Sequence, residues 1–82
     1  MFGLCMPMGE TYLLMKGGKQ ESVMLSDETQ PRKHIMECKY VLSAIKRVGY
    51  QNVDAIIYER NGKKIKVSME DYYAERGKEL EG

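Results

Sequence analysis

Residues 53–69 read VDAIIYERNGKKIKVSM, where Asn61-Gly62 separates two runs rich in apolar and β-branched residues. An Asn-Gly pair favours a type I′ turn, because both central positions of that turn need positive φ. We therefore predict a hairpin whose two-residue turn fixes the register. The opposite, solvated face should pair Glu59 with Lys64. The face predicted to enter the core contains Tyr58, Ile65, Ile56, Val67, Asp54 and Met69.

A second glycine turn lies upstream. Gly17-Gly18 separates two apolar-rich runs, roughly residues 10–16 and 19–25, and predicts another hairpin. Apolar and polar residues alternate imperfectly on both strands, so the register of this hairpin stays open.

The segment between the hairpins has helical periodicity. Pro31 stands where the first helical turn tolerates it, and Gly49 supplies a C-terminal stop. We predict one helix over residues 31–48, with Lys33 and Arg47 among the side chains that face away from the core. The predicted apolar stripe consists of Ile35, Cys38, Leu42 and Ile45, flanked by Val41 and Val48.

The C-terminal segment opens with Ser68-x-x-Asp71, which is similar to a capping box and predicts a short helix through Arg76 before Gly77 interrupts it. The complete prediction is one α+β domain over residues 1–82 with the order β-β-α-β-β-α. Two hairpins form one sheet covered by the central helix, and the second and third strands are parallel neighbours or near-neighbours.

Composition restricts the function classes. The 82 residues have a formal net charge of +1, so no overall field draws the protein to nucleic acid or acidic lipid. No stretch is long enough to span a bilayer, and residues 1–8 lack the features of a signal peptide. We expect a cytoplasmic protein in which Cys5 and Cys38 are free thiols.

Lys and Glu dominate the charged residues, a bias associated with hyperthermophile proteins. In this general style the chain is similar to small uncharacterised proteins of thermophilic methanogenic archaea. The resemblance implies a thermostable archaeal protein and assigns a role to no residue.

The predicted topology groups carboxylates from separate elements. Because the central helix runs back along the sheet, Asp54, Glu70 and Asp71 fall at the same end as Glu21. Ca²⁺ takes about 6 to 8 oxygen ligands, so this acidic pocket could bind it with help from carbonyls and water. We predict a small binding module with Ca²⁺ bound by these four residues. The alternative is that Glu70 and Asp71 only stabilise a helix N-terminus.

A softer metal site is a weaker hypothesis. His34 and Cys38 stand at i and i+4 on the predicted helix, and Cys5 could supply a third ligand. Because the paired motifs of zinc sites are missing, we expect Cys38 to be a small core hydrophobe instead. Apart from Ca²⁺, no cofactor is predicted.

Two further binding modes stay open. Met36, Tyr40 and Ala44 form an i, i+4, i+8 row on the outer helix face, which could bind a protein partner or a second copy. Nucleic-acid binding would be weak, since no RNP-like pattern is present. The groups that could serve it are Arg32-Lys33-His34, Lys63-Lys64-Lys66 and the tyrosines Tyr12, Tyr58, Tyr72 and Tyr73.

Catalysis is not expected. The sequence offers a single histidine, no glycine-rich phosphate loop and no nucleophile elbow. We therefore predict that the protein is not an enzyme.

Overall fold

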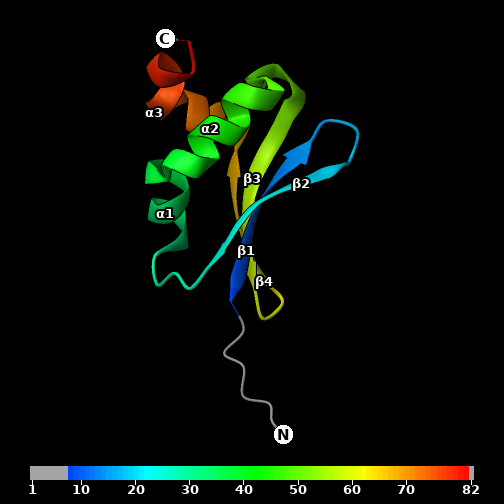
Figure 1. Cartoon of the computed structure of the whole chain (residues 1–82), viewed down its shortest axis with the longest axis vertical. Helices are drawn as coiled ribbons and strands as arrows, with labels where there is room; N and C mark the ends of the chain where they lie inside the picture. Colours follow the sequence, from blue (N-terminus) through cyan, green and yellow to red (C-terminus); the bar gives the residue numbers. More distant parts are fainter. Residues whose placement is uncertain (1–7, 82) are drawn as a thin grey trace, which may run out of the picture.

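The computed structural model describes residues 8–81 and confirms the α+β class (Figure 1). The element order matches the prediction, except that the central helix is divided in two. The elements are β1 (Gly9–Met15), β2 (Gln20–Ser26), α1 (Pro31–Glu37), α2 (Lys39–Val48), the 3-10 turn η1 (Tyr50–Asn52), β3 (Val53–Arg60), β4 (Lys63–Ser68) and α3 (Met69–Glu81).

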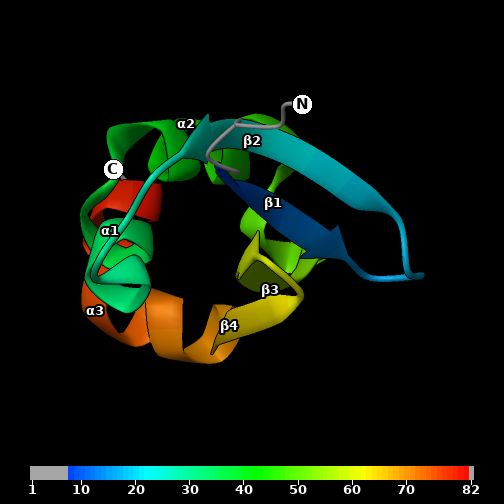
Figure 2. The same cartoon turned by 90° about the horizontal axis from the view of Figure 1, so that it is seen from below.

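The four strands form one antiparallel sheet in the order β2-β1-β3-β4. Both β2 and β3 are antiparallel to β1, so they run parallel to each other on its two sides, as the near-neighbour prediction required. Viewed from below, the curved sheet and the three helices surround the core (Figure 2). The helices leave the other face of the sheet, called here the open face, uncovered, and they leave β2 and β4 as the two sheet edges.

The second hairpin has the predicted register, with Tyr58 opposite Ile65. Both turn residues have positive φ, 54° at Asn61 and 80° at Gly62, as a type I′ turn requires. Two details of the core face were wrong. Asp54 is exposed, and Ile65 keeps 38% of its surface exposed because β4 is an edge strand.

The open face is less solvated than predicted. Ile57 is only 6% exposed and Ala55 is fully buried. In the β1–β3 ladder Tyr12 lies opposite Ile57, and Tyr12 is itself only 3% exposed. The middle of this face is therefore apolar, and the charged side chains lie toward its edges.

The first hairpin contains an irregularity that explains its poor alternation. Gly17 and Gly18 form the predicted turn with φ values of 97° and 96°. Along β1 the register with β2 shifts between Thr11 and Tyr12, so Val23 has no partner. This β-bulge changes which β2 side chains face the core on either side of it.

The single helix predicted over residues 31–48 is wrong, because the chain breaks it at Cys38. Cys38 has ψ 124°, an extended value, and α1 ends before it while α2 begins after it. Residues 31–48 therefore do not follow one helical period. Met36 in α1 and Ala44 in α2 are buried, at 8% and 6% exposure, and only Tyr40, at 55%, is exposed. The predicted outer row of Met36, Tyr40 and Ala44 is therefore not a continuous surface.

The C-terminal helix is longer than predicted. Asp71 donates its backbone N–H to Ser68 Oγ at 3.1 Å, which confirms the cap, but α3 continues through Gly77 to Glu81. A Cβ at Gly77 would lie 3.1 Å from the Tyr73 ring. Glycine here makes room for that ring and does not end the helix.

The core lies between the sheet and the helices. Within residues 8–81 no helix is long and apolar enough to cross a membrane. The largest fully buried side chains are Tyr72, Leu13, Ile35, Ile45, Ile56, Val41, Val53, Val67 and Thr11.

Candidate functional site: a groove beside the edge of β4

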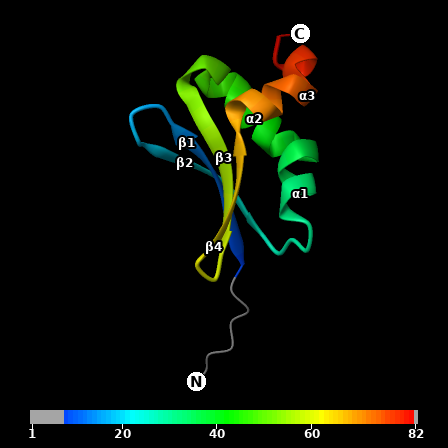
Figure 3. The same cartoon turned by 180° about the vertical axis from the view of Figure 1, so that it is seen from behind.

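A groove of about 570 Å³ lies between α1 and the edge strand β4, and Glu75 of α3 also lines it. Figure 3 shows α1 beside β4 in this region. The apolar part of the wall comes from Pro31 and Met36 of α1 and from Ile65 of β4. The remaining lining residues are Gln30, Arg32, Lys33, Glu37 and Glu75.

The groove continues toward the Asn61-Gly62 turn. A second hollow, of about 410 Å³, shares Pro31 and Ile65 with the first and extends to Tyr58 and Lys63. Together the two hollows lie beside Lys63 and Ile65 of β4 on the helix-covered side. An elongated ligand fits this shape better than a compact one.

The edge of β4 also offers main-chain hydrogen bonds. Residue pairs along an antiparallel ladder alternate between hydrogen-bonded and non-hydrogen-bonded, and a hydrogen-bonded pair closes a two-residue turn. Lys63 belongs to that closing pair. Ile65 and Val67 follow Lys63 at every second position, so they also form hydrogen-bonded pairs and their peptide groups face β3. The peptide groups of Lys64 and Lys66 therefore point outward from the sheet.

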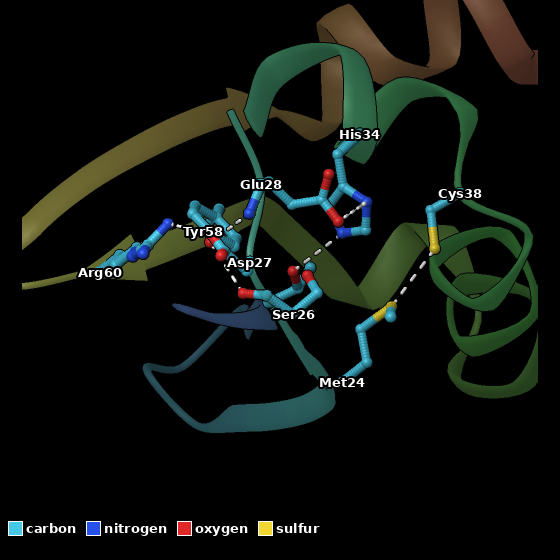
Figure 4. Close-up of polar contacts among 9 residues, drawn as sticks. Met24, Ser26, Asp27, Glu28, His34, Cys38, Tyr58 and Arg60 are labelled. Carbon is cyan, nitrogen blue, oxygen red and sulfur yellow. Dashed lines mark hydrogen bonds and ion pairs between the residues drawn. The ribbon is translucent and has the colours of Figure 1, made fainter. Parts of the chain in front are cut away.

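The Tyr58 hydroxyl fixes the segment between β2 and α1, which forms one wall of the second hollow (Figure 4). Tyr58 is 3% exposed. Its hydroxyl donates to the Ser26 carbonyl at 2.9 Å and accepts from the Glu28 backbone N–H at 3.1 Å. An ion pair between Arg60 and Asp27 fastens the same segment. The wall is thus held at three successive residues.

His34 joins this wall to the sheet. Its Nδ1 lies 3.3 Å from Glu28 Oε2, and its Nε2 lies 3.3 Å from Thr11 Oγ1. This order of carboxylate, imidazole and hydroxyl is the one that activates a nucleophile in hydrolases. Thr11, however, is fully buried, so its hydroxyl cannot reach a substrate in this conformation. The arrangement supports the fold and positions α1.

Tyr58→Phe, which removes one hydroxyl oxygen, tests how much the hydrogen bonds of this wall contribute to stability. Tyr58→Phe leaves the Ser26 carbonyl and the Glu28 N–H without their partner, and we expect the free energy of unfolding to fall by about 1–3 kcal/mol. Chemical denaturation followed by circular dichroism measures the change. Tyr40→Phe, which alters an exposed tyrosine, should leave stability unchanged. Equal stability of Tyr58→Phe and wild type would contradict the role of this hydroxyl.

The basic residues noted in the sequence gather around the edge of β4, Arg32, Lys33 and Lys63 on the groove side and Lys64 and Lys66 on the open face. Arg32 and Lys33 line the α1 side of the groove, and Lys63 lines its extension. All five are exposed. The two basic groups, which are about thirty positions apart in the chain, therefore lie near the same edge of the sheet.

The tyrosines do not accompany these basic residues at the surface. Tyr72 is fully buried, and this burial raises its pKa. Tyr58 and Tyr12 are each 3% exposed. Tyr73 lies beside Tyr50 with ring centroids 5.0 Å apart, and its hydrogen bond to Glu81 raises its pKa to about 12.

The four carboxylates of the predicted Ca²⁺ site are not drawn into one cluster. Glu21 pairs with Lys19 at 3.4 Å on the edge strand β2. Asp54 and Glu70 line a separate cleft of about 530 Å³, which Lys16 also lines.

Asp71 lies in the first turn of α3, where its backbone N–H meets the Ser68 cap. Across residues 8–81, no group of three or more His, Cys, Asp or Glu side chains is placed to hold a metal ion. Ca²⁺ binding stays a prediction. A saturable Ca²⁺-dependent shift of the Asp54 and Glu70 backbone signals would support it.

The softer metal ligands are also apart. Cys38 donates its thiol hydrogen to Met24 Sδ at 3.5 Å and is partly buried, as expected for a small core residue. His34 instead contacts Glu28 and Thr11. Cys5 lies outside the described residues.

Comparison with known proteins gives no relative: no family model, no curated protein and no solved structure matches the chain. Sequence reasoning missed this groove, although KKIK at residues 63–66 was its signal. An apolar residue flanked by lysines on a strand is typical of an edge with one exposed apolar position.

Proposed function

We propose that the protein is a small, non-enzymatic docking module that binds an extended segment of a partner protein as an additional strand on β4. The observation that carries this proposal is the exposed Ile65 on a free sheet edge, facing a groove of about 570 Å³ beside α1. In strand addition the main chain supplies affinity, and pockets for alternate side chains supply specificity.

The groove provides such a pocket on one face of the added strand. Side chains of a strand alternate between the two sheet faces, so every second residue of the bound segment would point into the groove. There it would meet Ile65, Pro31 and Met36. The intervening residues would point to the open face, next to Lys64 and Lys66.

The same edge disfavours a second copy of the protein. Two β4 strands paired edge to edge would bring the lysines at 63, 64 and 66 close to the same lysines of the other copy. Lysines on an edge strand are a known protection against such self-pairing. A different chain without this charge pattern avoids the repulsion, which favours a partner protein over a homodimer.

A proline substitution tests the proposal. Lys66→Pro removes the outward N–H of β4, and proline is tolerated at edge positions whose N–H faces solvent. Peptides of about nine residues, near the upper end of the usual range of strand lengths, would be selected from a displayed random library on the wild-type protein. We expect the selected peptides to bind Lys66→Pro at least about tenfold more weakly, the equivalent of one main-chain hydrogen bond.

The control is Lys66→Thr, which loses the same charge but keeps the N–H and a β-branched side chain. It should lose clearly less affinity than Lys66→Pro for peptides that depend on strand addition, because only the proline removes the outward N–H. Selected peptides that bind Lys66→Pro and wild type equally would contradict docking at β4.

A further inference from the structure

We infer that the segment docked on β4 alternates acidic and apolar residues, the acidic side chains facing Lys64 and Lys66 and the apolar ones entering the groove. This inference rests on the proposed docking function and specifies its partner. It follows from the charge around the edge and from the period of the strand.

The edge holds a local excess of positive charge. Five basic side chains border it, against three carboxylates: Glu37 and Glu75 in the wall of the first hollow, and Glu28, which contacts His34, in the wall of the second. The whole chain has a net charge of only +1. Between residues 8 and 81, none of the five takes part in an ion pair. An acidic partner would neutralise charges that the fold leaves free.

The register shows why Lys64 is free. Glu59 lies directly opposite Lys64 in the β3–β4 ladder, and the sequence predicted a cross-strand ion pair between them. In the structure Glu59 instead accepts a hydrogen bond from the Tyr12 hydroxyl at 3.4 Å. The Lys64 ammonium is therefore available to a carboxylate on the next strand outward.

Alternation follows from the two different faces of β4. Lys64 and Lys66 share the open face, while Ile65 between them lies on the groove face. Residues directly opposite on neighbouring antiparallel strands share a face. A bound strand therefore meets charge, apolar surface and charge in turn, and the complementary sequence is acidic, apolar, acidic.

An RNA strand is the competing occupant, because its phosphates would also neutralise the lysines. Sequence-tolerant binding of single strands usually adds aromatic side chains on which bases stack. The tyrosine nearest the groove, Tyr58, is 3% exposed and engaged in two hydrogen bonds, and the groove wall presents Pro31, Met36 and Ile65 instead. These contacts favour a peptide.

Three peptides of equal length test the inference. Each has the same solubilising flanks around a core of Glu-Val-Glu-Val-Glu, Gln-Val-Gln-Val-Gln or Lys-Val-Lys-Val-Lys. By fluorescence anisotropy at about 0.1 M salt, we expect the Glu peptide to bind about tenfold more tightly than the Gln peptide and the Lys peptide to bind least. The advantage of Glu over Gln should shrink at about 0.5 M salt, where screening is stronger.

A charge reversal provides the matched variant. Lys64→Glu combined with Lys66→Glu changes two exposed side chains and keeps the backbone of β4. It should reverse the order, so that the Lys peptide binds best. If the Glu peptide still binds most tightly to this variant, Lys64 and Lys66 are not the residues that contact the acidic side chains.

The remaining outcomes separate the inference from the function on which it rests. Equal affinity for the Glu and Gln peptides, with both lost on Lys66→Pro, would overturn the acidic preference and leave strand docking in place. Binding of all peptides that is unaffected by Lys66→Pro would overturn docking at β4 itself. Tighter binding of an oligouridylate than of the Glu peptide, lost in the charge-reversed variant, would assign the edge to nucleic acid.

Discussion

Ile65→Asp is expected to abolish peptide docking while the fold stays intact. Ile65 is the exposed apolar side chain at the centre of the edge, and an aspartate there would remove its apolar contact and repel an acidic partner. A central contact of this kind accounts for about 2 kcal/mol or more of binding free energy, so affinity should fall at least about thirtyfold. Titration calorimetry with a selected peptide measures the loss.

The opposite edge of the sheet supplies the control. Leu25 on β2 is even more exposed, at 60%, and Leu25→Asp introduces the same charge at an exposed apolar position. It should leave peptide affinity unchanged. Equal losses in the two variants would indicate a general effect of negative charge and would contradict a site at β4. Circular dichroism should show that both variants keep the wild-type spectrum.

Gly9→Ala is expected to produce the largest loss of stability from a single added methyl group. A Cβ at Gly9 would overlap Cζ and Oη of Tyr58, and that ring is almost fully buried. The ring would have to move, which would break the hydrogen bonds of its hydroxyl to Ser26 and Glu28. Overpacking and lost hydrogen bonds together should lower the free energy of unfolding by about 3 kcal/mol.

A double-mutant cycle separates this overlap from a general effect at the start of β1. In a Tyr58→Ala background the ring is gone, so adding Gly9→Ala should cost much less than it does in the wild type. The coupling is read from denaturation midpoints of the four proteins. Identical costs of Gly9→Ala in the two backgrounds would contradict the contact with Tyr58.

Local chemistry explains which parts of the fold could be predicted. Asn61-Gly62 and Gly17-Gly18 determine their turns through positive φ, and a two-residue turn then determines the register of the second hairpin. Ser68 caps α3 for a similarly local reason. These features need only neighbouring residues, so the sequence is sufficient for them.

The helix break and the helix extension depend on packing between distant elements. Nothing around Cys38 disfavours a helix, yet the chain turns there so that α1 contacts β3 and β4 while α2 contacts β2. Gly77 is a helix breaker by propensity, but the Tyr73 ring occupies the space that a side chain would fill. Tertiary contacts override the local signal at both positions.

The groove could not be predicted because it requires the order of strands in the sheet. The two basic groups were visible in the sequence, but only the order β2-β1-β3-β4 makes β4 an edge and places α1 beside it. The predicted row on the outer helix face was wrong because it too depends on how the helices pack on the sheet. Met36 packs into the core and contributes to the groove wall.

Hydrogen exchange along β4 is the most direct test of strand addition at this edge. In the free protein the amides of Lys64 and Lys66 should exchange quickly because they point outward, whereas those of Ile65 and Val67 should already be protected by pairing with β3. A saturating selected peptide should slow exchange at Lys64 and Lys66 and change Ile65 and Val67 little. Unchanged exchange at Lys64 and Lys66 in the saturated complex would contradict strand addition.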